Sequence, residues 1–397
     1  MVIGIRPDRP VEAPEWYAGQ PVERDGAMRL ASRRTLLLVG GGAIVAAGVG
    51  AGAIEASRAP TRAMEPWSIA GSYGEIRRNA LSWALLAPNP HNLQPWRAQL
   101  VGQDGVALFL DPERTLPQTD PFGRQITIGL GCFIDLMRMA AAESGFGVDL
   151  DFYPEGEAEQ APVVRAWFRP EAAQPDPLFR AAQTRRTSRA VYDPRPLPAE
   201  AVATLSGYGA VVSEPEAVAN LRALAKEAWD IELATPRTWK ESVDVLRFGA
   251  RQIDASPDGL AVRGGFINLM AALGLVTREA QLPQGSTAWQ SAMNSFNDAI
   301  ASTPAFVVQV SEGNRRRDQL DAGARWLRLS LAATQLGLSL QPVSQALQEY
   351  PEMSGPYGRI HALYAEPGHT VQMLARIGFS PVVPPAPRWR LETKIVG

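Results

Sequence analysis

Apolar residues along the chain form short runs and two longer stripes, and each pattern predicts a different element. Short, mostly apolar runs predict strands at 106–110, 148–152, 163–168 and 305–310. Residues 131–146 and 323–338 instead carry an apolar face at helical spacing and end beside a glycine, which is a common end of a helix. Strands and helices therefore occur together in both parts of the chain, and we expect an α+β fold.

The two predicted helices share one sequence pattern, Gly-x8-Ala-Ala-x3-Gly. In the first helix the pattern runs from Gly131 to Gly145, and in the second from Gly323 to Gly337. Each helix follows a predicted strand, so the order strand, loop, helix occurs twice. We therefore expect two related units in tandem, at 71–180 and 181–397.

Residues 213–301 have no counterpart in the first unit and form an insertion in the second. Helices are predicted at 216–234 and 239–253, and Gly-rich, polar segments follow. An insertion of this size either adds packing or covers a site as a lid, and the sequence leaves both open.

The N-terminal region predicts a targeting segment rather than a folded domain. Residues 1–30 are polar and without periodicity, so we expect them to be disordered. Arg33 and Arg34 then precede a charge-free run at 35–54, an arrangement typical of a twin-arginine export signal. The run is also long enough to span a bilayer, which leaves an uncleaved membrane anchor open. A dinucleotide-binding loop is excluded because its glycine spacing fails here.

The export signal predicts where the protein works. We expect the region 1–54 to engage the twin-arginine (Tat) export machinery, and the folded protein to reach the periplasm or cell envelope. Membrane anchoring through 35–54 is the alternative. Residues 55–70 are expected to form a linker to the folded part.

Composition excludes several function classes. The net charge of −2 gives no basic surplus for nucleic acid, and 46% hydrophobic residues are typical of a globular chain. A single cysteine, Cys132, excludes an internal disulfide, and three scattered histidines make no metal site. We therefore expect no bound metal.

The segment 85–97 is the most informative stretch for chemistry. Pro88 and Pro90 end a predicted helix, and a short polar loop follows before a strand that starts near Arg97. Amide side chains on such a rigid turn suit the edge of a heteroaromatic ring, or else bond their own backbone. The residues expected at the ring are Pro88, Asn89, His91, Asn92 and Gln94.

A second segment is rich in arginine. Arg185, Thr187 and Arg189 form the pattern Arg-x-Thr-x-Arg. Guanidinium groups and a hydroxyl are suited to a phosphate monoester, although such a pentapeptide is also common on solvated surfaces.

Together these segments resemble the FMN-dependent nitroreductases. Ala-Pro-x3-Asn-x-Gln-Pro-Trp at 87–96 resembles the family's first flavin-contact segment, and His91 before Asn92 resembles the Acg-type branch. The segment 185–189 resembles the family's phosphate-gripping pattern. Two later segments, 341–345 and 376–390, resemble its ring-side loop and terminal strand, and the likeness spans 72–396. The resemblance implies backbone contacts to FMN at Ser344 and Gln345 and phosphate contacts from Arg388 and Arg390.

The two motifs lie in different halves, and this decides the expected architecture. Family members are usually homodimers in which one subunit gives the loop and the other grips the phosphate. Here the first half holds the loop and the second half holds the phosphate motif, so the resemblance implies one FMN per chain. We expect a nitroreductase-like fold of two tandem units that form an intrachain pseudo-dimer.

The function implied by the resemblance is an FMN oxidoreductase of nitroreductase type. Hydride would pass through FMN to an unidentified acceptor, from a small-molecule donor or a redox-partner protein. The alternative is a non-catalytic FMN-binding or sequestering protein with the insertion as a lid. No side chain is assigned as a catalytic acid or base.

Overall fold

The computed structural model describes residue 53, residues 55–170 and residues 173–397. The expected disordered segment, the arginine pair and nearly all of the uncharged run at 35–54 therefore lie outside the described residues. The described residues all belong to one compact unit.

The first half contains a four-stranded antiparallel sheet, sheet A. Its strands are β1 (Trp96–Val101), β2 (Gly105–Leu110), β3 (Gly147–Phe152) and β4 (Val164–Arg169), in the order β1-β2-β4-β3. Burial alternates along β1 and β4 as a half-buried sheet requires, whereas β2 is buried from Gly105 to Leu108, and its Val106 and Leu108 belong to the core. Helices α3 (Ile76–Ala84) and α4 (Arg124–Glu143) pack together against this face.

The second half repeats this plan in sheet B. Its strands are β5 (Ala210–Val212), β8 (Ala305–Ser311), β9 (Ser339–Pro342) and β10 (Thr370–Gly378), in the order β5-β8-β10-β9. Helix α5 (Ala199–Ser206) precedes the sheet, and α11 (Arg316–Gln335) connects β8 to β9 as α4 connects β2 to β3. The four predicted strands and both predicted helices are confirmed, and each helix begins earlier than its sequence pattern showed.

Helices α4 and α11 cross at the two glycines that start the repeated pattern. A methyl group added to Gly131 would lie 2.1 Å from the Leu320 carbonyl oxygen, and one added to Gly323 would lie 2.1 Å from that of Ile128. Each carbonyl belongs to the residue three positions before the other glycine, so the contact is reciprocal, as in a two-fold interface. An ion pair from Arg328 to Asp135, at 2.8 Å, joins the same helices.

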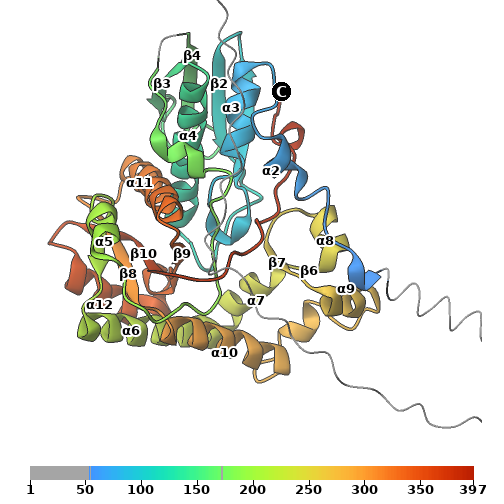
Figure 1. Ribbon diagram of the computed structural model, residues 1–397, viewed down its shortest axis with the longest axis vertical. Helices are drawn as coiled ribbons and strands as arrows, with labels where there is room; N and C mark the ends of the chain where they lie inside the picture. The colour runs from blue at the N-terminus through green and yellow to red at the C-terminus, as the bar shows by residue number, and fades with distance from the viewer. Residues whose placement is uncertain (1–52, 54, 171–172) are drawn as a thin grey trace, which may run out of the picture. The chain divides into compact units, whose positions relative to one another are not determined.

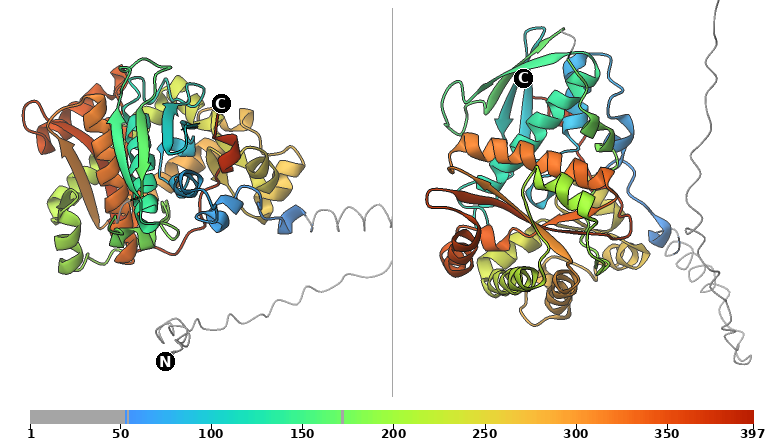
Figure 2. Two further views of the ribbon diagram at one scale, coloured as in Figure 1. Left: turned by 90° about the horizontal axis from the view of Figure 1, so that it is seen from above. Right: turned by 60° about the vertical axis from the view of Figure 1, so that its left-hand side comes forward.

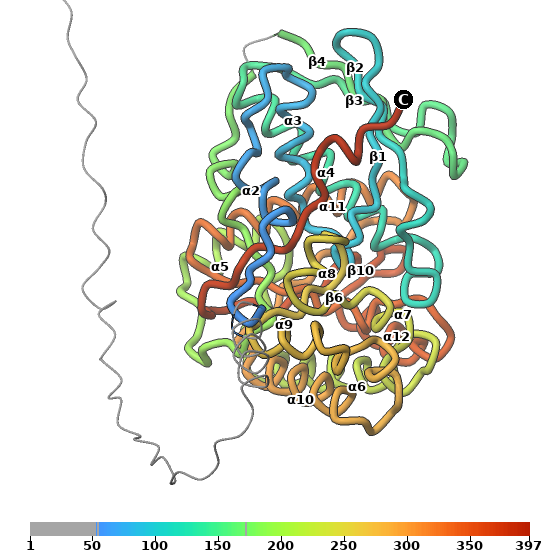
Figure 3. The backbone as a smooth tube through the Cα atoms, turned by 90° about the vertical axis from the view of Figure 1, so that its right-hand side faces the viewer, coloured from blue at the N-terminus to red at the C-terminus, as the bar shows by residue number. Residues whose placement is uncertain are grey.

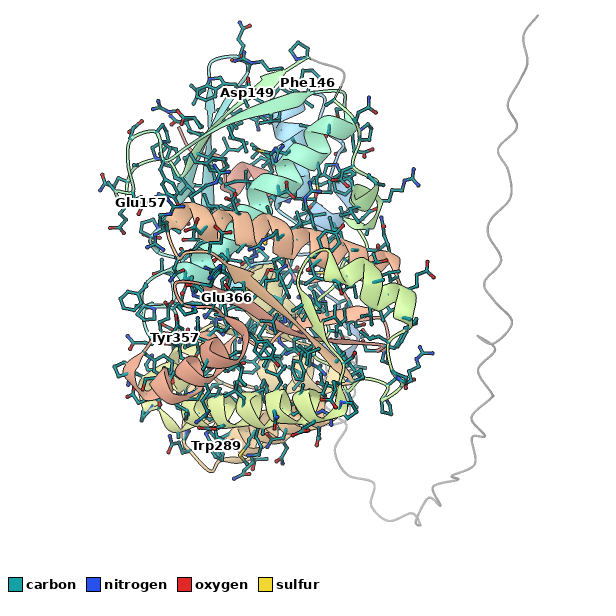
Figure 4. The ribbon with its side chains drawn as sticks, turned by 90° about the vertical axis from the view of Figure 1, so that its left-hand side faces the viewer. Phe146, Asp149, Glu157, Trp289, Tyr357 and Glu366 are labelled. Carbon is teal, nitrogen blue, oxygen red and sulfur yellow. The ribbon has the colours of Figure 1, made fainter. Side chains whose placement is uncertain are left out.

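The crossed helices lie between the two sheets (Figure 2). On its other face, sheet B is covered by α6 (Pro215–Ala234), α10 (Thr287–Ala301) and α12 (Ser354–Tyr364), which build a second core. Figure 4 shows α11 between the sheets, with Asp149 on β3 and Trp289 on α10 near opposite ends of this unit. Helix α4 is long and apolar enough to cross a membrane, but 83% of that stretch is buried, so it is a core helix.

The rest of the insertion forms a small subdomain beside the first half (Figure 1). It contains α7 (Pro236–Asp244), β6 (Leu246–Phe248), α8 (Gly249–Ala255), β7 (Leu260–Val262) and α9 (Gly265–Ala272). The prediction of one helix over 239–253 is wrong. Gly249 takes a φ of +72° and starts a new helix, whose Ala250 amide donates to Asn268, while β6 pairs with β7.

The chain crosses between the two sheets twice. After β4, the chain reaches sheet B through a parallel bridge between Thr187 and Leu340. After β10, it returns to sheet A, where Ile395 bridges Ala98 on β1. Figure 3 shows this C-terminal segment running past α2 and α3 towards β1. We call residues 379–397 the C-terminal arm.

Residues 55–70 were expected to form a linker but are packed. They contain α2 (Glu65–Ile69), and the buried Trp67 ring donates to the Ala386 carbonyl at 2.7 Å. The guanidinium of Arg186 stacks on the same ring at 4.5 Å. The remaining short 3₁₀ helices are η2 (Pro90–Asn92), η3 (Pro177–Ala181), η4 (Glu279–Gln281), η5 (Gln345–Leu347), η6 (Pro351–Met353) and η7 (Leu391–Thr393).

Candidate functional site

The loop at 88–94 has a strained backbone. His91, Asn92 and Gln94 have φ values of 46°, 56° and 55°, and only one other non-glycine residue among those described has a positive φ. Such conformations cost about 1–3 kcal/mol each and persist where the surroundings hold them in place. The loop lies directly on α4, because a methyl group on Gly129 would lie 3.0 Å from Pro90.

The amide side chains of this loop divide into two groups. Asn92 donates to the Pro387 carbonyl at 3.0 Å and accepts from Arg388, so both ends of its amide are bonded within the protein. Gln94 donates to the Pro257 carbonyl at 2.7 Å and accepts from the Trp389 amide at 2.9 Å. Asn89 accepts from the backbone of Gln94, and its amide nitrogen reaches only Ala87, so it stays at the edge of the loop.

The C-terminal arm holds the loop through two buried cations. Arg388 uses its guanidinium donors on the carbonyls of residues 85–87 and 387 and on Asn92, which leaves no donor for a further anion. Lys394 donates to the Gln94 carbonyl at 2.8 Å, and burial lowers the pKa of its amine to about 7. Arg390, by contrast, pairs with Glu65 at the surface.

The arginines of the phosphate-like motif lack counter-ions. Arg185 is buried and donates to the Leu86 carbonyl at 3.2 Å. Burial, reinforced by the positive charge of Arg186, lowers the pKa of Arg185 to about 10. Among the described residues, no carboxylate lies within 4 Å of Arg185, Arg186 or Arg189. Since an unpaired buried cation is costly, the cluster is suited to an anionic ligand.

Arg189 lies close enough to His91 for its charge to act on the imidazole. Arg189 is exposed at the surface, and desolvation by the protein around it lowers the pKa of its guanidinium. Burial and the charge of Arg189 lower the pKa of His91 to about 4, so its imidazole is neutral at pH 7. The His91 Nδ1 atom is buried and has no protein partner. The first-half loop and the second-half motif therefore meet here.

The ring-side loop expected at Ser344 and Gln345 lies next to the same motif. The Ser188 amide donates to the Leu340 carbonyl at 3.2 Å, which joins the arginine segment to β9 just before this loop. The Gln345 Oε1 atom is buried without a partner. Nearby, the buried carboxylate of Glu232 accepts from Gln348, and burial raises its pKa.

The insertion reaches the candidate site. The Gly259 amide donates to the Asn92 carbonyl at 3.1 Å. The adjacent Asp258 pairs with Arg247 at 2.7 Å and with Arg114 of the first half, and it accepts from the Trp389 ring. This ionic cluster fixes the insertion against the loop.

The sequence interpretation missed several residues of this site. Gly129 lies within a helix and has no special spacing, and Lys394 lies near the chain end without a motif. Lys394 is one of three lysines in the chain, and only its burial distinguishes it as a candidate. Burial is a property of the folded chain and cannot be read from the sequence.

Other features of the described residues lie away from this site. No group of three or more His, Cys, Asp or Glu side chains among them could hold a metal ion. A hollow on the open face of sheet A is lined by Phe109, Arg165 and Trp167, and it includes none of the predicted site residues.

The chain resembles proteins that are named as nitroreductases. It is 25% identical to Rv3131 of Mycobacterium tuberculosis over 336 residues, which make up 80% of this chain and 90% of Rv3131. The name of Rv3131 provisionally assigns that protein to the NAD(P)H nitroreductases. It is 38% identical over 80 residues, 20% of this chain and 24% of the relative, to the Acg protein of the same organism, which is similarly named. No family model matches the chain.

Two solved structures are also similar to parts of the chain. One is the FMN-dependent nitroreductase NfnB of Mycobacterium smegmatis in complex with NADPH, with a TM-score of 0.33, 19% identity, and coverage of 53% of this chain and 92% of that one. The other is a Bacteroides fragilis nitroreductase with bound FMN, with a TM-score of 0.30, 13% identity, and coverage of 55% and 97%.

Proposed function

We propose that the chain binds one FMN between its two halves and acts as an oxidoreductase of nitroreductase type. The observation that carries the proposal is the arginine group at 185–189, which lies without a carboxylate partner beside a strained polar loop. The names of the curated relatives agree with this interpretation.

The phosphate of FMN would bind at Arg185, Thr187 and Arg189. A phosphate monoester carries a charge near −2 and accepts several charge-assisted hydrogen bonds. Arg185 keeps donors that no described acceptor takes, and Arg189 of the same segment is exposed. The residues present therefore fit the group. Arg388 and Arg390 have other partners, so we propose that neither binds the phosphate.

The ring would lie near His91, Asn89 and the backbone at Ser344 and Gln345. The unpartnered His91 Nδ1 and Gln345 Oε1 atoms are suited to a heteroaromatic edge. Asn92 and Gln94 are positioning residues, because their amides hold the loop on the C-terminal arm and the insertion. When bound, FMN supplies hydride transfer, and the chain supplies orientation and a positive field.

We also propose that the two halves are a fused pseudo-dimer. The equivalent strand order of the two sheets and the reciprocal glycine contact support this. One loop and one arginine motif then make one complete site.

The location of the protein remains a proposal from the sequence. We propose export through the Tat machinery to the periplasm or cell envelope, carried by Arg33 and Arg34. Changing both arginines to lysine and fractionating the cells tests it, and unchanged delivery to the envelope would show that the pair is not the signal.

Two measurements test the function. Purified protein is denatured, and the released flavin is identified and counted against polypeptide; we expect FMN at one per chain. The holoprotein is then titrated anaerobically with NADH, NADPH and a reduced quinone, and flavin absorbance should fall with at least one donor. A ratio of two, or absence of flavin after loading with FMN, would refute the composite site.

A second candidate function is FMN storage without turnover. It is favoured by the insertion, which is fixed on the loop through Pro257 and Gly259 and would close the ring face. A flavin that is reduced by light and a sacrificial donor, but by none of the three chemical donors, would support storage.

A further inference from the structure

Helix α9 and the turn after it carry exposed apolar side chains that no described residue covers. Phe266 is 72% exposed, Leu273 is 62% exposed and Leu275 is 60% exposed, all within ten residues of one another. Single exposed apolar residues are common, but a cluster of this kind usually marks a contact surface. We call residues 265–275 the α9 surface.

The α9 surface lies against the first described residues of the chain. The Asn268 side chain donates to the Arg58 carbonyl at 2.7 Å, and a methyl group on Gly265 would lie 2.8 Å from the Ala56 carbonyl. Glu55 pairs with Arg251 of α8 at 2.6 Å, which fixes the same segment. In Figure 3, α9 lies where the described chain begins.

This position places the α9 surface beside the end of the uncharged run. The run at 35–54 has about the 20 residues needed to cross a bilayer. Only Glu55 separates it from Ala56, and one residue spans at most about 3.6 Å. If the run spans a membrane, the α9 surface is therefore held at the level of the headgroups.

The charge of the surrounding sequence fits an anionic lipid surface. Arg58 and Arg62 are exposed on the segment adjacent to α9. Arg263 and Arg278 are half-buried and donate to the carbonyls of Pro385 and Leu246, and the exposed Glu279 follows them. Exposed apolar side chains with arginines nearby are typical of segments that lie in a membrane interface.

We propose that the α9 surface is a membrane-contact site that inserts Phe266, Leu273 and Leu275 into the headgroup region of an anionic bilayer. The proposal rests on retention of the 35–54 run as an anchor and is independent of flavin binding. It fixes one side of the protein, the side with α8 and α9, towards the membrane.

The chain is well suited to a direct test by single-cysteine labelling. Its one cysteine, Cys132, is buried, and burial raises the pKa of its thiol, so a reagent reacts with an introduced exposed cysteine instead. Leu273→Cys labels the α9 surface. Leu363→Cys on α12 is the matched control, because both leucines are 62% exposed.

The full chain, labelled with a polarity-sensitive fluorophore, is reconstituted with phosphatidylglycerol vesicles. We expect the label at 273 to shift to the blue, to resist iodide and to be quenched by nitroxide lipids, while the label at 363 stays open to iodide. Sedimentation with the vesicles shows separately whether the run at 35–54 anchors the chain in the membrane.

Three outcomes would overturn the proposal. The first is that the chain fails to sediment with the vesicles. The second is that the label at 273 stays in water although the chain sediments. The third is that the label is equally shielded without vesicles. The last result would indicate a second copy of the chain on the α9 surface. Flavin content is measured on the same samples, so loss of the FMN site is seen independently.

Discussion

The arginines of this protein's interior differ in the hydrogen-bond acceptors that surround their guanidinium groups. Arg376 and Arg388 are almost fully buried, and each gives its guanidinium donors to neutral oxygens, mostly backbone carbonyls. Arg185 is also buried but has one such acceptor, and Arg189 of the same motif is exposed and donates to no described residue. A cation with accepted hydrogen bonds is structural, whereas one with free donors is suited to a ligand.

Arg189→Ala should weaken FMN about 10- to 100-fold, because one charge-assisted contact worth about 1.5–3 kcal/mol is lost. Riboflavin, which lacks the phosphate, should be nearly unaffected. Both ligands are titrated by flavin fluorescence. Arg390→Ala is the control, since that side chain pairs with Glu65 at the surface. Equal loss for both ligands at Arg189 would remove it from the phosphate site.

His91 predicts a pH dependence of stability. Its pKa is about 4 in the folded chain against 6.5 ordinarily, so acidification protonates the unfolded chain first. The free energy of unfolding contributed by His91 is present above about pH 6.5 and is lost as the pH falls towards 4. His91→Asn, which tolerates the positive φ, should give a flatter profile in this window. Urea unfolding at several pH values measures the free energy of unfolding of both proteins. Parallel pH profiles for the parent chain and His91→Asn would contradict the lowered pKa of His91.

At the scale of elements, the contact between α4 and α11 depends on the absence of two side chains. The glycines at the crossing let the two helix backbones approach each other, and Arg328 with Asp135 adds an ion pair nearby. The same contact carries the loop at 88–94, since Gly129 on α4 lies beneath Pro90. Helix packing and site geometry are therefore coupled through one helix.

Gly131→Ala and Gly323→Ala should each lower the free energy of unfolding by about 1–3 kcal/mol, because the added methyl group overpacks the crossing. Gly358→Ala is the matched control, since it lies in α12 with nothing within 4 Å of the new methyl group. It should be neutral or stabilise by up to about 1 kcal/mol. Chemical denaturation measures all three variants, and three similar values would show that the crossing has room to relax.

At the scale of the whole molecule, the C-terminal arm connects the second half to the loop of the first. Arg388, Trp389 and Lys394 all bond to the segment 85–94, and Ile395 extends sheet A. The insertion adds a further connection through Asp258. The candidate site is thus held by parts of the chain that are about 300 residues apart.

Deleting residues 388–397 should lower the free energy of unfolding by more than about 3 kcal/mol, because buried carbonyls and Asn92 lose their donors. It should also expose the loop at 88–94 to proteases. Denaturation and limited proteolysis of the deletion are compared with Arg390→Ala, which changes the arm only at its surface. A deletion as stable and as resistant as that control would show that the arm does not hold the loop.

The sequence by itself determined the local elements. Short apolar runs and Gly-ended apolar stripes predicted the strands and the two long helices, because apolar positions mark the side chains that are buried. The repeated glycine pattern predicted two related units. The polar loop at 88–94 and the arginine motif were assigned to flavin and phosphate through their resemblance to the nitroreductases, with which their chemistry agrees. The interrupted helix at 239–253 was missed because its break depends on Asn268, which lies in α9, outside the window of any helical pattern.

Only the tertiary structure decided the partners of each polar side chain. Asn92, Gln94 and Arg388 all look like ligand contacts in the sequence, yet they bond to one another or to distant carbonyls. His91 acquires its lowered pKa from burial and from the charge of Arg189, and no motif encodes either of these. The physical reason is that hydrogen bonds and desolvation depend on which segments meet in space, and here these segments come from opposite ends of the folded chain.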